Sequence, residues 1–314
     1  MQRRKIVIVG TGFVGMSMAY CLLNQGVAEE LVLVDVDKQK AEGEAMDLSH
    51  GVPCANTEME IKSGNYSDCV DASLVVITAG VAQKPNQTRR ELLNINAQII
   101  SQITRNIVAS GFNGIFLVAS NPVDLMTYVV QKVSAFKKEK VIGSGTVLDT
   151  ARLRYLIGKK LGISTKNVHA YIMGEHGDSS FVPWTHCYVG CKPLNEIIEL
   201  ADLDEIYTEV QQAAYEIIKR KQATYYGIGL ALTKLVKAIL NDEKGIYTVS
   251  TYLSGIYIGV PAVIGRNGVR EILKLNLSKD EQEKFEKSRQ VLMNMIKEIE
   301  DEANTVSSKL HAKI

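Results

Sequence analysis

A histidine flanked by glycines has the clearest catalytic chemistry in this sequence. His176 lies in the segment GEHGDS at residues 174–179, directly after an alternating apolar stretch from Val168 to Met173. That stretch predicts a strand whose end presents the imidazole instead of burying it. A histidine presented in this way can exchange protons near neutral pH, although a single histidine is more often structural.

Two charged residues have the spacing to support such a histidine. Asp149 and Arg152 are three residues apart in a helical pattern and should share one face, whereas Arg154 should point elsewhere. A carboxylate such as Asp149 can hold His176 in one tautomer and stabilise its protonated form. A guanidinium such as Arg152 can bind a substrate carboxylate through two hydrogen bonds. The same spacing also occurs in ordinary surface ion pairs, so that alternative stays open.

A glycine motif near the start of the chain indicates a dinucleotide site. Gly10, Gly12 and Gly15 belong to GTGFVG, which follows the apolar run Lys5–Val9 and opens a helical pattern. In this context the first glycine permits a tight turn, the second lets the backbone approach a pyrophosphate, and the third allows close helix–strand packing. Asp35 ends the next apolar run, where it can bind ribose hydroxyls and repel the extra phosphate of NADP. The motif therefore favours NAD, the alternative being glycines that serve only a turn and an aspartate that ends a strand.

The elements that must position these residues follow an alternating pattern. Short apolar runs with helical patterns between them occur at Lys5–Val9, Leu31–Asp35, Leu74–Ala79, Ile115–Ala119 and Val141–Ile142. This alternation predicts an α/β fold with a doubly wound parallel sheet of the Rossmann type. The rhythm changes near residue 144, so we expect an NAD-binding domain over residues 1–143 and an α+β catalytic substrate domain over residues 144–314.

The second half of the chain predicts longer helices. Helical patterns cover Val147–Leu161 and most of Asp202–Leu240, and the segment Lys244–Val263 is rich in β-branched and aromatic residues, which predicts strands of a second sheet. A capping box at Ser278 and Glu281 opens a last helix. Its apolar residues recur on one face, which we expect to pack against the core: Phe285, Leu292, Met295 and Ile299.

Composition excludes several classes of protein. Lys and Arg total 36 against 35 Asp and Glu, so a net charge of +1 provides no broad attraction for nucleic acid or an anionic membrane. The five cysteines include no CxxC pair, which argues against a disulfide framework and a zinc site, and we expect no metal. No apolar run has the length of a membrane span, and the first one is too short for a signal peptide. We expect a cytoplasmic protein.

Six motifs occur in the order found in L-lactate dehydrogenases, and the chain resembles the bacterial type of that family over nearly its whole length. They are GTGFVG at 10–15, GVAQKP at 80–85 followed by Thr88 and Arg89, SNPVD at 120–124, DTAR at 149–152, GEHGDS at 174–179 and ATYYG at 223–227. Six ordered motifs are far more specific than any one of them.

The resemblance implies a role for each matching catalytic position. His176 donates a proton to the carbonyl oxygen of pyruvate as NADH delivers hydride to the carbon, and Asp149 stabilises the imidazolium in the reverse direction. Arg152 binds the substrate carboxylate. Arg89 moves in as a loop closes and polarises the carbonyl.

The resemblance also implies substrate and cofactor contacts. Asn121 positions the substrate oxygen and the nicotinamide, although Asn121-Pro122 alternatively forms a plain turn. Thr224 shapes the far wall of the substrate pocket. Beside the three glycines and Asp35, the implied NAD contacts are Phe13, Val14, Lys40, Tyr66, Gly80, Ser101, Ala119, Asn121 and Ser144.

Gln83 indicates which 2-hydroxy acid is the substrate. Malate dehydrogenases of the same fold carry arginine at this position, where it pairs with the second carboxylate of oxaloacetate. Glutamine supplies no charge, and enclosing an unpaired carboxylate costs roughly 3–5 kcal/mol. We therefore expect pyruvate and L-lactate as substrates. The alternatives are a malate dehydrogenase, an enzyme for branched 2-keto acids, and a non-catalytic NAD-binding protein.

Two positions depart from the family pattern. Asn86 stands where glycine is usual, and Gln222 stands where glycine is common. Either change can alter loop mobility or the shape of the pocket.

Arg154 and His169 suggest a regulatory site. They match the two residues with which many bacterial family members bind fructose 1,6-bisphosphate at a subunit interface. Two cationic groups suit a phosphate ligand shared across a two-fold axis. The resemblance thus implies a homotetramer with fructose 1,6-bisphosphate as its effector, the alternative being an exposed arginine and a packed histidine.

Overall fold

The structure is a computed structural model that describes residues 4–81 and 89–311. Within those ranges nine strands form one sheet in the order β12-β11-β10-β6-β5-β4-β1-β2-β3. Six of these strands are parallel: β1 (Lys5–Val9), β2 (Glu30–Val34), β3 (Glu60–Ser63), β4 (Leu74–Ile77), β5 (Ile115–Val118) and β6 (Val141–Gly143). The order from β3 to β6 is that of the doubly wound fold, so the predicted fold class is confirmed.

The predictions for the strands of the parallel sheet were accurate in position and incomplete in number. Each of the five predicted runs contains a strand, with ends that differ by at most two residues. The stretch Val168–Met173, also predicted as a strand, forms one only at Val168–His169, and Met173 makes an isolated bridge to Phe181. The strand β3 was not predicted, because its sequence EIKS is mostly polar. It lies at the edge of the sheet beside β2, where one side remains accessible to water.

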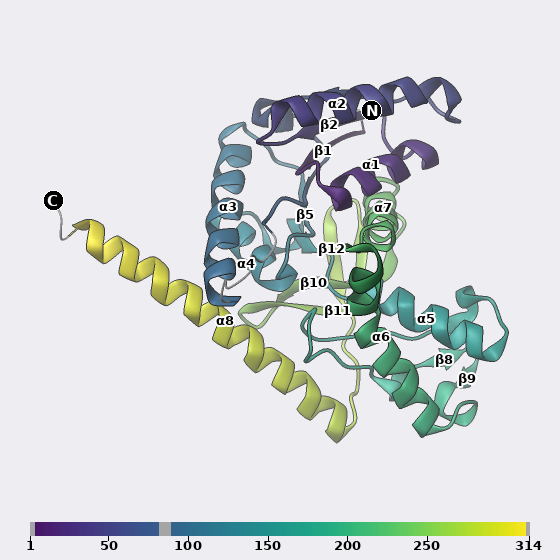
Figure 1. Ribbon diagram of the computed structural model, residues 1–314. Helices are drawn as coiled ribbons and strands as arrows, with labels where there is room; N and C mark the ends of the chain where they lie inside the picture. Colours follow the sequence, from purple (N-terminus) through teal and green to yellow (C-terminus); the bar gives the residue numbers. More distant parts are fainter. Residues whose placement is uncertain (1–3, 82–88, 312–314) are drawn as a thin grey trace.

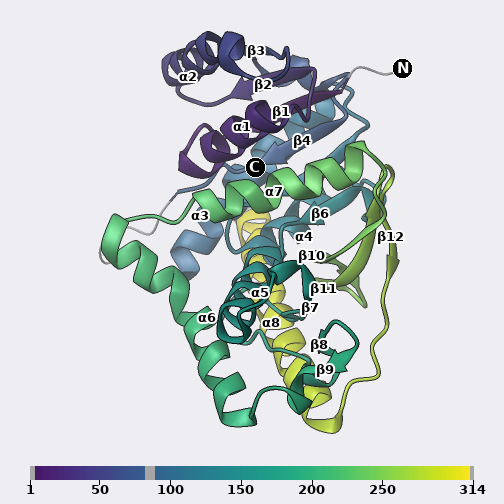
Figure 2. The same cartoon turned by 90° about the vertical axis from the view of Figure 1, so that its right-hand side faces the viewer.

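Helices cover both faces of this sheet (Figures 1 and 2). They are α1 (Phe13–Gln25), α2 (Lys38–Gly51), α3 (Arg89–Ala109), α4 (Val123–Ser134) and α7 (Tyr226–Leu240), together with α8 (Lys279–His311). Along β1, Ile6 and Ile8 pack with the cluster that includes α1 and α7, whereas Val7 and Val9 pack with the cluster of α3 and α4. Alternate residues of one strand thus serve two separate cores, which explains its continuous apolar run.

The segment Lys244–Val263 was expected to form a second sheet, and that prediction was wrong. The strands β10 (Gly245–Leu253), β11 (Ile256–Gly265) and β12 (Gly268–Ile272) extend the main sheet in antiparallel orientation, and Ser250 of β10 pairs with Gly143 of β6. A side chain at Gly143 would overlap Thr127 and Ser250. The glycine therefore lets β10 approach β6 closely.

A smaller layer lies around α5 (Val147–Leu161) and α6 (Leu200–Lys221). A three-stranded sheet accompanies them, formed by β7 (Val168–His169), β8 (Tyr188–Val189) and β9 (Lys192–Pro193). Helix α8 begins with the predicted capping box, in which Ser278 and Glu281 exchange backbone and side-chain hydrogen bonds. Its predicted apolar stripe packs against the cores, with Leu292 buried. No helix in the described ranges combines the length and apolar character needed to cross a membrane.

Candidate active site

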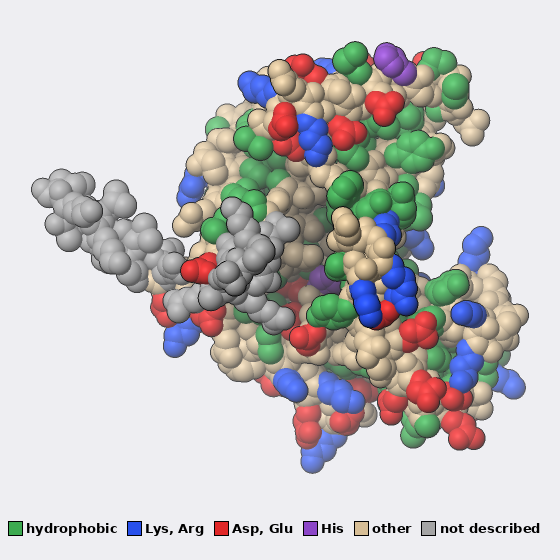
Figure 3. Space-filling view, viewed as in Figure 1, with side chains coloured by type: hydrophobic (Ala, Val, Ile, Leu, Met, Phe, Trp, Pro, Cys, Tyr) green, Lys and Arg blue, Asp and Glu red, His purple; other side chains and the backbone are tan. Residues whose placement is uncertain are grey.

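Three side chains from two segments form a connected polar chain. Nδ1 of His176 lies 2.7 Å from Oδ2 of Asp149, and Nη1 of Arg152 lies 2.7 Å from Oδ1 of the same carboxylate. The side chains of Asp149 and Arg152 are 16% and 15% exposed, so this pair is not an ordinary surface ion pair. The imidazole is 31% exposed and remains accessible on its other side. Figure 3 shows a hollow on this face of the molecule with a histidine side chain in it, beside a group of Lys and Arg side chains.

Hydrogen bonds of two threonine side chains hold the start of α5 against the segment that carries His176. Thr146 Oγ1 donates to the carbonyl of Ile172 at 2.6 Å, and the N–H of Ile172 donates to Thr150 Oγ1 at 2.9 Å. Two residues further on, Gly174 and Gly259 of β11 exchange backbone hydrogen bonds. These contacts set the distance between Asp149 and His176, which are 27 residues apart in the chain.

The electrostatics of this site favour a protonated imidazole. Burial alone would lower the pKa of His176, but the carboxylates of Asp149 and Asp124 outweigh burial and the repulsion by Arg152, so the pKa is raised. Burial would raise the pKa of Asp149, but the charges of His176 and Arg152 lower it. A carboxylate that stays ionised beside an imidazole is the arrangement that a histidine acid–base needs.

The loop that carries His176 has two further anchors, which the sequence analysis missed. The backbone N–H of His176 donates to Oδ2 of Asp124 at 2.8 Å, and the N–H of Glu175 donates to Oγ of Ser288 at 2.6 Å. Both acceptors are buried. The sequence contains a feature that could have identified each of them. Asp124 is the one charged residue in the apolar run VDLMTYVV, and Ser288 lies on the apolar stripe of α8 between Phe285 and Leu292.

The glycine motif has the geometry expected of a pyrophosphate site. Gly10 has φ 110°, and a Cβ on it would lie 2.6 Å from the backbone nitrogen of Ala79. A Cβ on Gly15 would collide with the carbonyl oxygen of Gly10, so the helix packs against the turn as predicted. Among the residues that the structure describes, none has an atom within 4 Å of a Cβ added to Gly12, and none caps the N-terminus of α1 with its side chain. Free N–H donors beside open space fit the phosphates of NAD.

Asp35 faces the glycine motif. Its Oδ2 accepts hydrogen bonds from the N–H and the hydroxyl of Thr11 at 2.6 and 2.9 Å, and its Oδ1 accepts from the N–H of Asp37. Burial would raise the pKa of Asp35, but these hydrogen bonds and the charge of Lys40 lower it. The carboxylate of Asp35 therefore stays charged beside the glycine motif.

The predicted cofactor contacts gather at the carboxyl ends of the parallel strands. Five positions follow parallel strands at their carboxyl ends: Gly10 after β1, Asp35 after β2, Gly80 beyond β4, Ala119 after β5 and Ser144 after β6. The rest lie on neighbouring elements: Phe13 and Val14 in the first turn of α1, Lys40 in the first turn of α2, Tyr66 at the start of a 3-10 turn (Tyr66–Cys69), and Ser101 within α3. Ligands of open α/β sheets bind at the carboxyl ends of the strands.

The substrate side of the site is described in part. Gln83 and Asn86 lie outside the described residues, and the structure describes Arg89 only as the first residue of α3. Asn121 is exposed beyond β5, its carbonyl accepts from Asn96 Nδ2 at 3.3 Å, and the bond to Pro122 is cis. Thr224 lies half-buried between α6 and α7.

Gln222, the second departure from the family pattern, ends α6 in a left-handed conformation with φ 69°. Glycine adopts this conformation without strain, which gives a physical reason why glycine is common at the position.

Arg154 and His169 lie on neighbouring elements away from Asp149. The Nε of Arg154 donates to the carbonyl of Ala170 at 2.9 Å, and its guanidinium lies 4.9 Å from the centre of the Tyr171 ring. Arg154 is half-buried and His169 is exposed. This is the reverse of an exposed arginine with a packed histidine.

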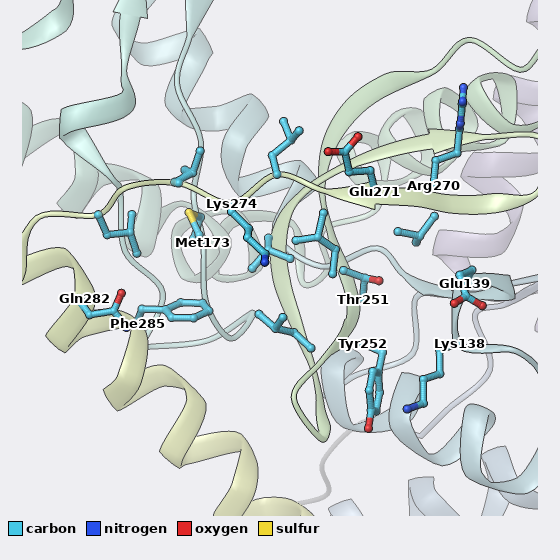
Figure 4. Close-up of a pocket in the computed structure, with 17 residues that line it drawn as sticks. Lys138, Glu139, Met173, Thr251, Tyr252, Arg270, Glu271, Lys274, Gln282 and Phe285 are labelled. Carbon is cyan, nitrogen blue, oxygen red and sulfur yellow. The ribbon is translucent and has the colours of Figure 1, made fainter.

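A separate cavity of about 600 Å³ lies between β12 and the start of α8 (Figure 4). Its apolar lining includes Met173 and Phe285, and Lys138, Arg270 and Lys274 stand around it. The residues that line this cavity do not include His176, Asp149 or Arg152.

Comparison with known proteins agrees with this geometry. Residues 4–143 match the model of the lactate/malate dehydrogenase NAD-binding domain, and residues 146–303 match that of the α/β C-terminal domain of the same family. The chain belongs to the lactate/malate dehydrogenase family. The expected cofactor, NAD, is that of the matching family domain.

Similar members of the family include lactate dehydrogenases of bacteria and one from a metagenome library. An L-lactate dehydrogenase of Bacillus cereus is 56% identical over 300 residues, which are 92% of this chain and 96% of that protein. A lactate dehydrogenase from a Medee basin deep-sea metagenome library has a TM-score of 0.94 and 52% identity, covering 96% of this chain and 100% of that one. A ligand-bound minor L-lactate dehydrogenase of Enterococcus mundtii has a TM-score of 0.93 and 49% identity, covering 95% and 98%. The predicted resemblance to lactate dehydrogenases is thereby confirmed.

Proposed function

We propose that this family member interconverts pyruvate and L-lactate with NAD, and that His176 is the proton donor and acceptor. The observation that carries the proposal is the single carboxylate of Asp149, which contacts both the imidazole of His176 and the guanidinium of Arg152. One residue thereby sets the position of the proton-transfer group relative to the group that binds the substrate.

The protein's part in the reaction follows from these contacts. Because Nδ1 of His176 is hydrogen-bonded to Asp149, the proton to be transferred is carried on Nε2. Arg152 keeps further N–H donors beyond the one that faces Asp149, and these bind the substrate carboxylate. NADH supplies the hydride for the carbonyl carbon, and His176 supplies the proton for the carbonyl oxygen. The raised pKa of His176 keeps that proton available near neutral pH.

The division of labour between the two halves of the chain is part of this proposal. Residues 1–143 hold NAD through the turn of Gly10 and Gly12, the open N-terminus of α1 and the ribose-binding Asp35. Residues 144–314 supply His176 and its partners. The division is supported by the two family models, which match residues 4–143 and 146–303.

We assign the selectivity for pyruvate to Gln83, in the sequence before α3, because glutamine brings no charge toward a second carboxylate. Arg89 is assigned the polarisation of the substrate carbonyl. Thr224, from the link between α6 and α7, forms the opposite wall.

The regulatory part of the proposal concerns fructose 1,6-bisphosphate and a homotetramer. Arg154 donates to the carbonyl of Ala170, the residue that follows His169, and the imidazole of His169 is exposed. We assign these two side chains to one anion site. A ligand shared across a two-fold axis would favour assembly.

The experiment is NADH oxidation by the purified protein with pyruvate, oxaloacetate or 2-ketoisocaproate, each with and without fructose 1,6-bisphosphate. We expect the fastest oxidation with pyruvate, and a lower apparent KM or a shift toward tetramer with the sugar bisphosphate. Preference for oxaloacetate would contradict the role of Gln83, and preference for 2-ketoisocaproate would identify a branched-acid enzyme. Arg154→Ala should remove the response to the sugar bisphosphate without abolishing pyruvate reduction.

A further inference from the structure

Asp124 is a buried carboxylate that the mechanism above does not use. It lies in the first turn of α4 and is 2% exposed. Its Oδ2 accepts the backbone N–H of His176 at 2.8 Å. The hydroxyl of Ser250 lies beside it and favours its ionised form, although neither Oδ1 of Asp124 nor Oγ of Ser250 makes a hydrogen bond of good geometry among the described residues.

A charged group is an unfavourable choice for this position if it serves only as a hydrogen-bond acceptor. Burying an ionised carboxylate carries a large desolvation penalty, whereas an asparagine or serine oxygen would accept the same N–H at much lower cost. The penalty is visible in Asp124 itself, because burial raises its pKa to about 6. A carboxylate retained under these conditions indicates that its charge has a use.

The charged groups around His176 show what that use is. Asp149 and Arg152 face it from α5, Asp124 from α4, and Glu175 lies in the same loop. Arg152 is paired with Asp149 and opposes the protonated imidazole, so it cancels part of the effect of that carboxylate. Asp124 adds a second negative charge, from α4.

We propose that Asp124 is a positioning residue of the active site, which fixes the backbone of His176 and, through its negative charge, helps Asp149 to stabilise the protonated imidazole. Its effect on turnover rests on the proposed proton transfer by His176. Its effect on the imidazole itself does not, because that follows from the contacts of the folded chain alone.

The test is Asp124→Asn in the full-length protein, which keeps an oxygen for the N–H of His176 and removes the charge. The titration of His176 is followed by NMR with histidine labelled at Cε1, and its resonance is assigned by its loss in His176→Gln. We expect the midpoint to fall by roughly 0.5–1 pH unit, and kcat/KM for pyruvate at pH 7.5 to fall roughly 3–10-fold. An unchanged midpoint would overturn the proposal.

Two further variants separate charge from geometry. Ser288→Ala removes the neighbouring anchor, at the N–H of Glu175, without a change of charge, so it should slow turnover and leave the midpoint in place. Asp204→Asn removes an exposed carboxylate of α6 and should change neither quantity. An equal fall of the midpoint in either variant would show that the charge of Asp124 has no special role.

Ser250→Ala provides a second route if Asp124→Asn does not fold. The carboxylate remains, but loss of the hydroxyl makes its ionisation less favourable, so the midpoint of His176 should fall in the same direction by a smaller amount. No fall in this variant would also count against the proposal. If the wild-type protein did not reduce pyruvate, the proposed function would fail while the NMR midpoint still decided the role of Asp124.

Discussion

Oδ2 of Asp149 lies 2.7 Å from Nδ1 of His176. The contact leaves Nε2 as the only ring nitrogen free to exchange a proton with substrate. It also joins two segments that are 27 residues apart, α5 and the loop after Met173. The consequences for catalysis can be measured directly.

Asp149→Asn should lower kcat for pyruvate reduction by about 10²–10³-fold. The amide cannot stabilise an imidazolium, and it can present its N–H₂ group to Nδ1 and so impose the wrong tautomer. Steady-state kinetics of the variant with its circular dichroism spectrum would check this, with Asp204→Asn as the matched control. A fall of less than tenfold in a folded variant would mean that His176 does not depend on this carboxylate.

Gly12→Ala and Gly15→Ala should fail in different ways. A methyl group at Gly12 meets no atom of residues 4–81 or 89–311, so the melting temperature should stay within about 1–2 °C while NADH affinity falls by about tenfold or more. A methyl group at Gly15 meets the carbonyl of Gly10 and should lower stability by about 2–4 kcal/mol. Thermal unfolding and NADH fluorescence titration measure both effects. Gly43→Ala, in open space on α2, is the control and should not weaken NADH binding.

Asp124→Asn should make the protein more stable at neutral pH even though it becomes less active. Burial raises the pKa of Asp124 from 3.8 to about 6, so the folded protein holds this proton more tightly than the unfolded chain does. The contribution of this group to stability therefore decreases as the pH rises from about 4 through about 6, by up to about 3 kcal/mol.

The comparison requires unfolding of wild type and variant at pH 4.5 and 7.5 at one protein concentration, since assembly also affects stability. The free energy of unfolding of the variant, relative to that of the wild type, should be larger at pH 7.5 than at pH 4.5. A difference that is the same at both pH values would show that Asp124 titrates normally.

Gln83→Arg should raise kcat/KM for oxaloacetate by about 10²-fold or more and reduce it for pyruvate. The added guanidinium would pair with the second carboxylate, which glutamine leaves without a partner. Gln83→Lys tests whether a point charge suffices without the bidentate geometry. If oxaloacetate activity does not rise in Gln83→Arg, substrate choice is determined elsewhere in the pocket.

Gln222 should tolerate glycine and reject a β-branched residue. Because Gln222 is left-handed at φ 69°, Gln222→Val should lower the free energy of unfolding by about 1–2 kcal/mol. Gln222→Gly should stay within about 1 kcal/mol of the wild type, because relief of strain is offset by a more flexible unfolded chain. Urea unfolding measures both. Equal stability of the valine and glycine variants would rule out strain at this position.

Local sequence determined the elements and much of the chemistry. The apolar runs located β1, β2, β4, β5 and β6, and the GTGFVG context indicated the turn at Gly10 and the packing at Gly15. The strands and the glycine turn both depend on interactions between near neighbours in the chain, so they can be predicted from the local pattern of residues. The i, i+3 spacing likewise put Asp149 and Arg152 on one helix face, as their ion pair confirms.

Only the tertiary structure decided how distant segments meet. Strands β10 to β12 joined the main sheet because Gly143 lets Ser250 approach, a contact between residues more than 100 positions apart. Asp124 and Ser288 became anchors of the His176 loop because α4 and α8 both reach it in the folded chain. The local sequence pattern does not contain that information. The charge that acts on His176 is therefore a property of the folded chain, since it depends on which carboxylates the packing brings near and removes from water.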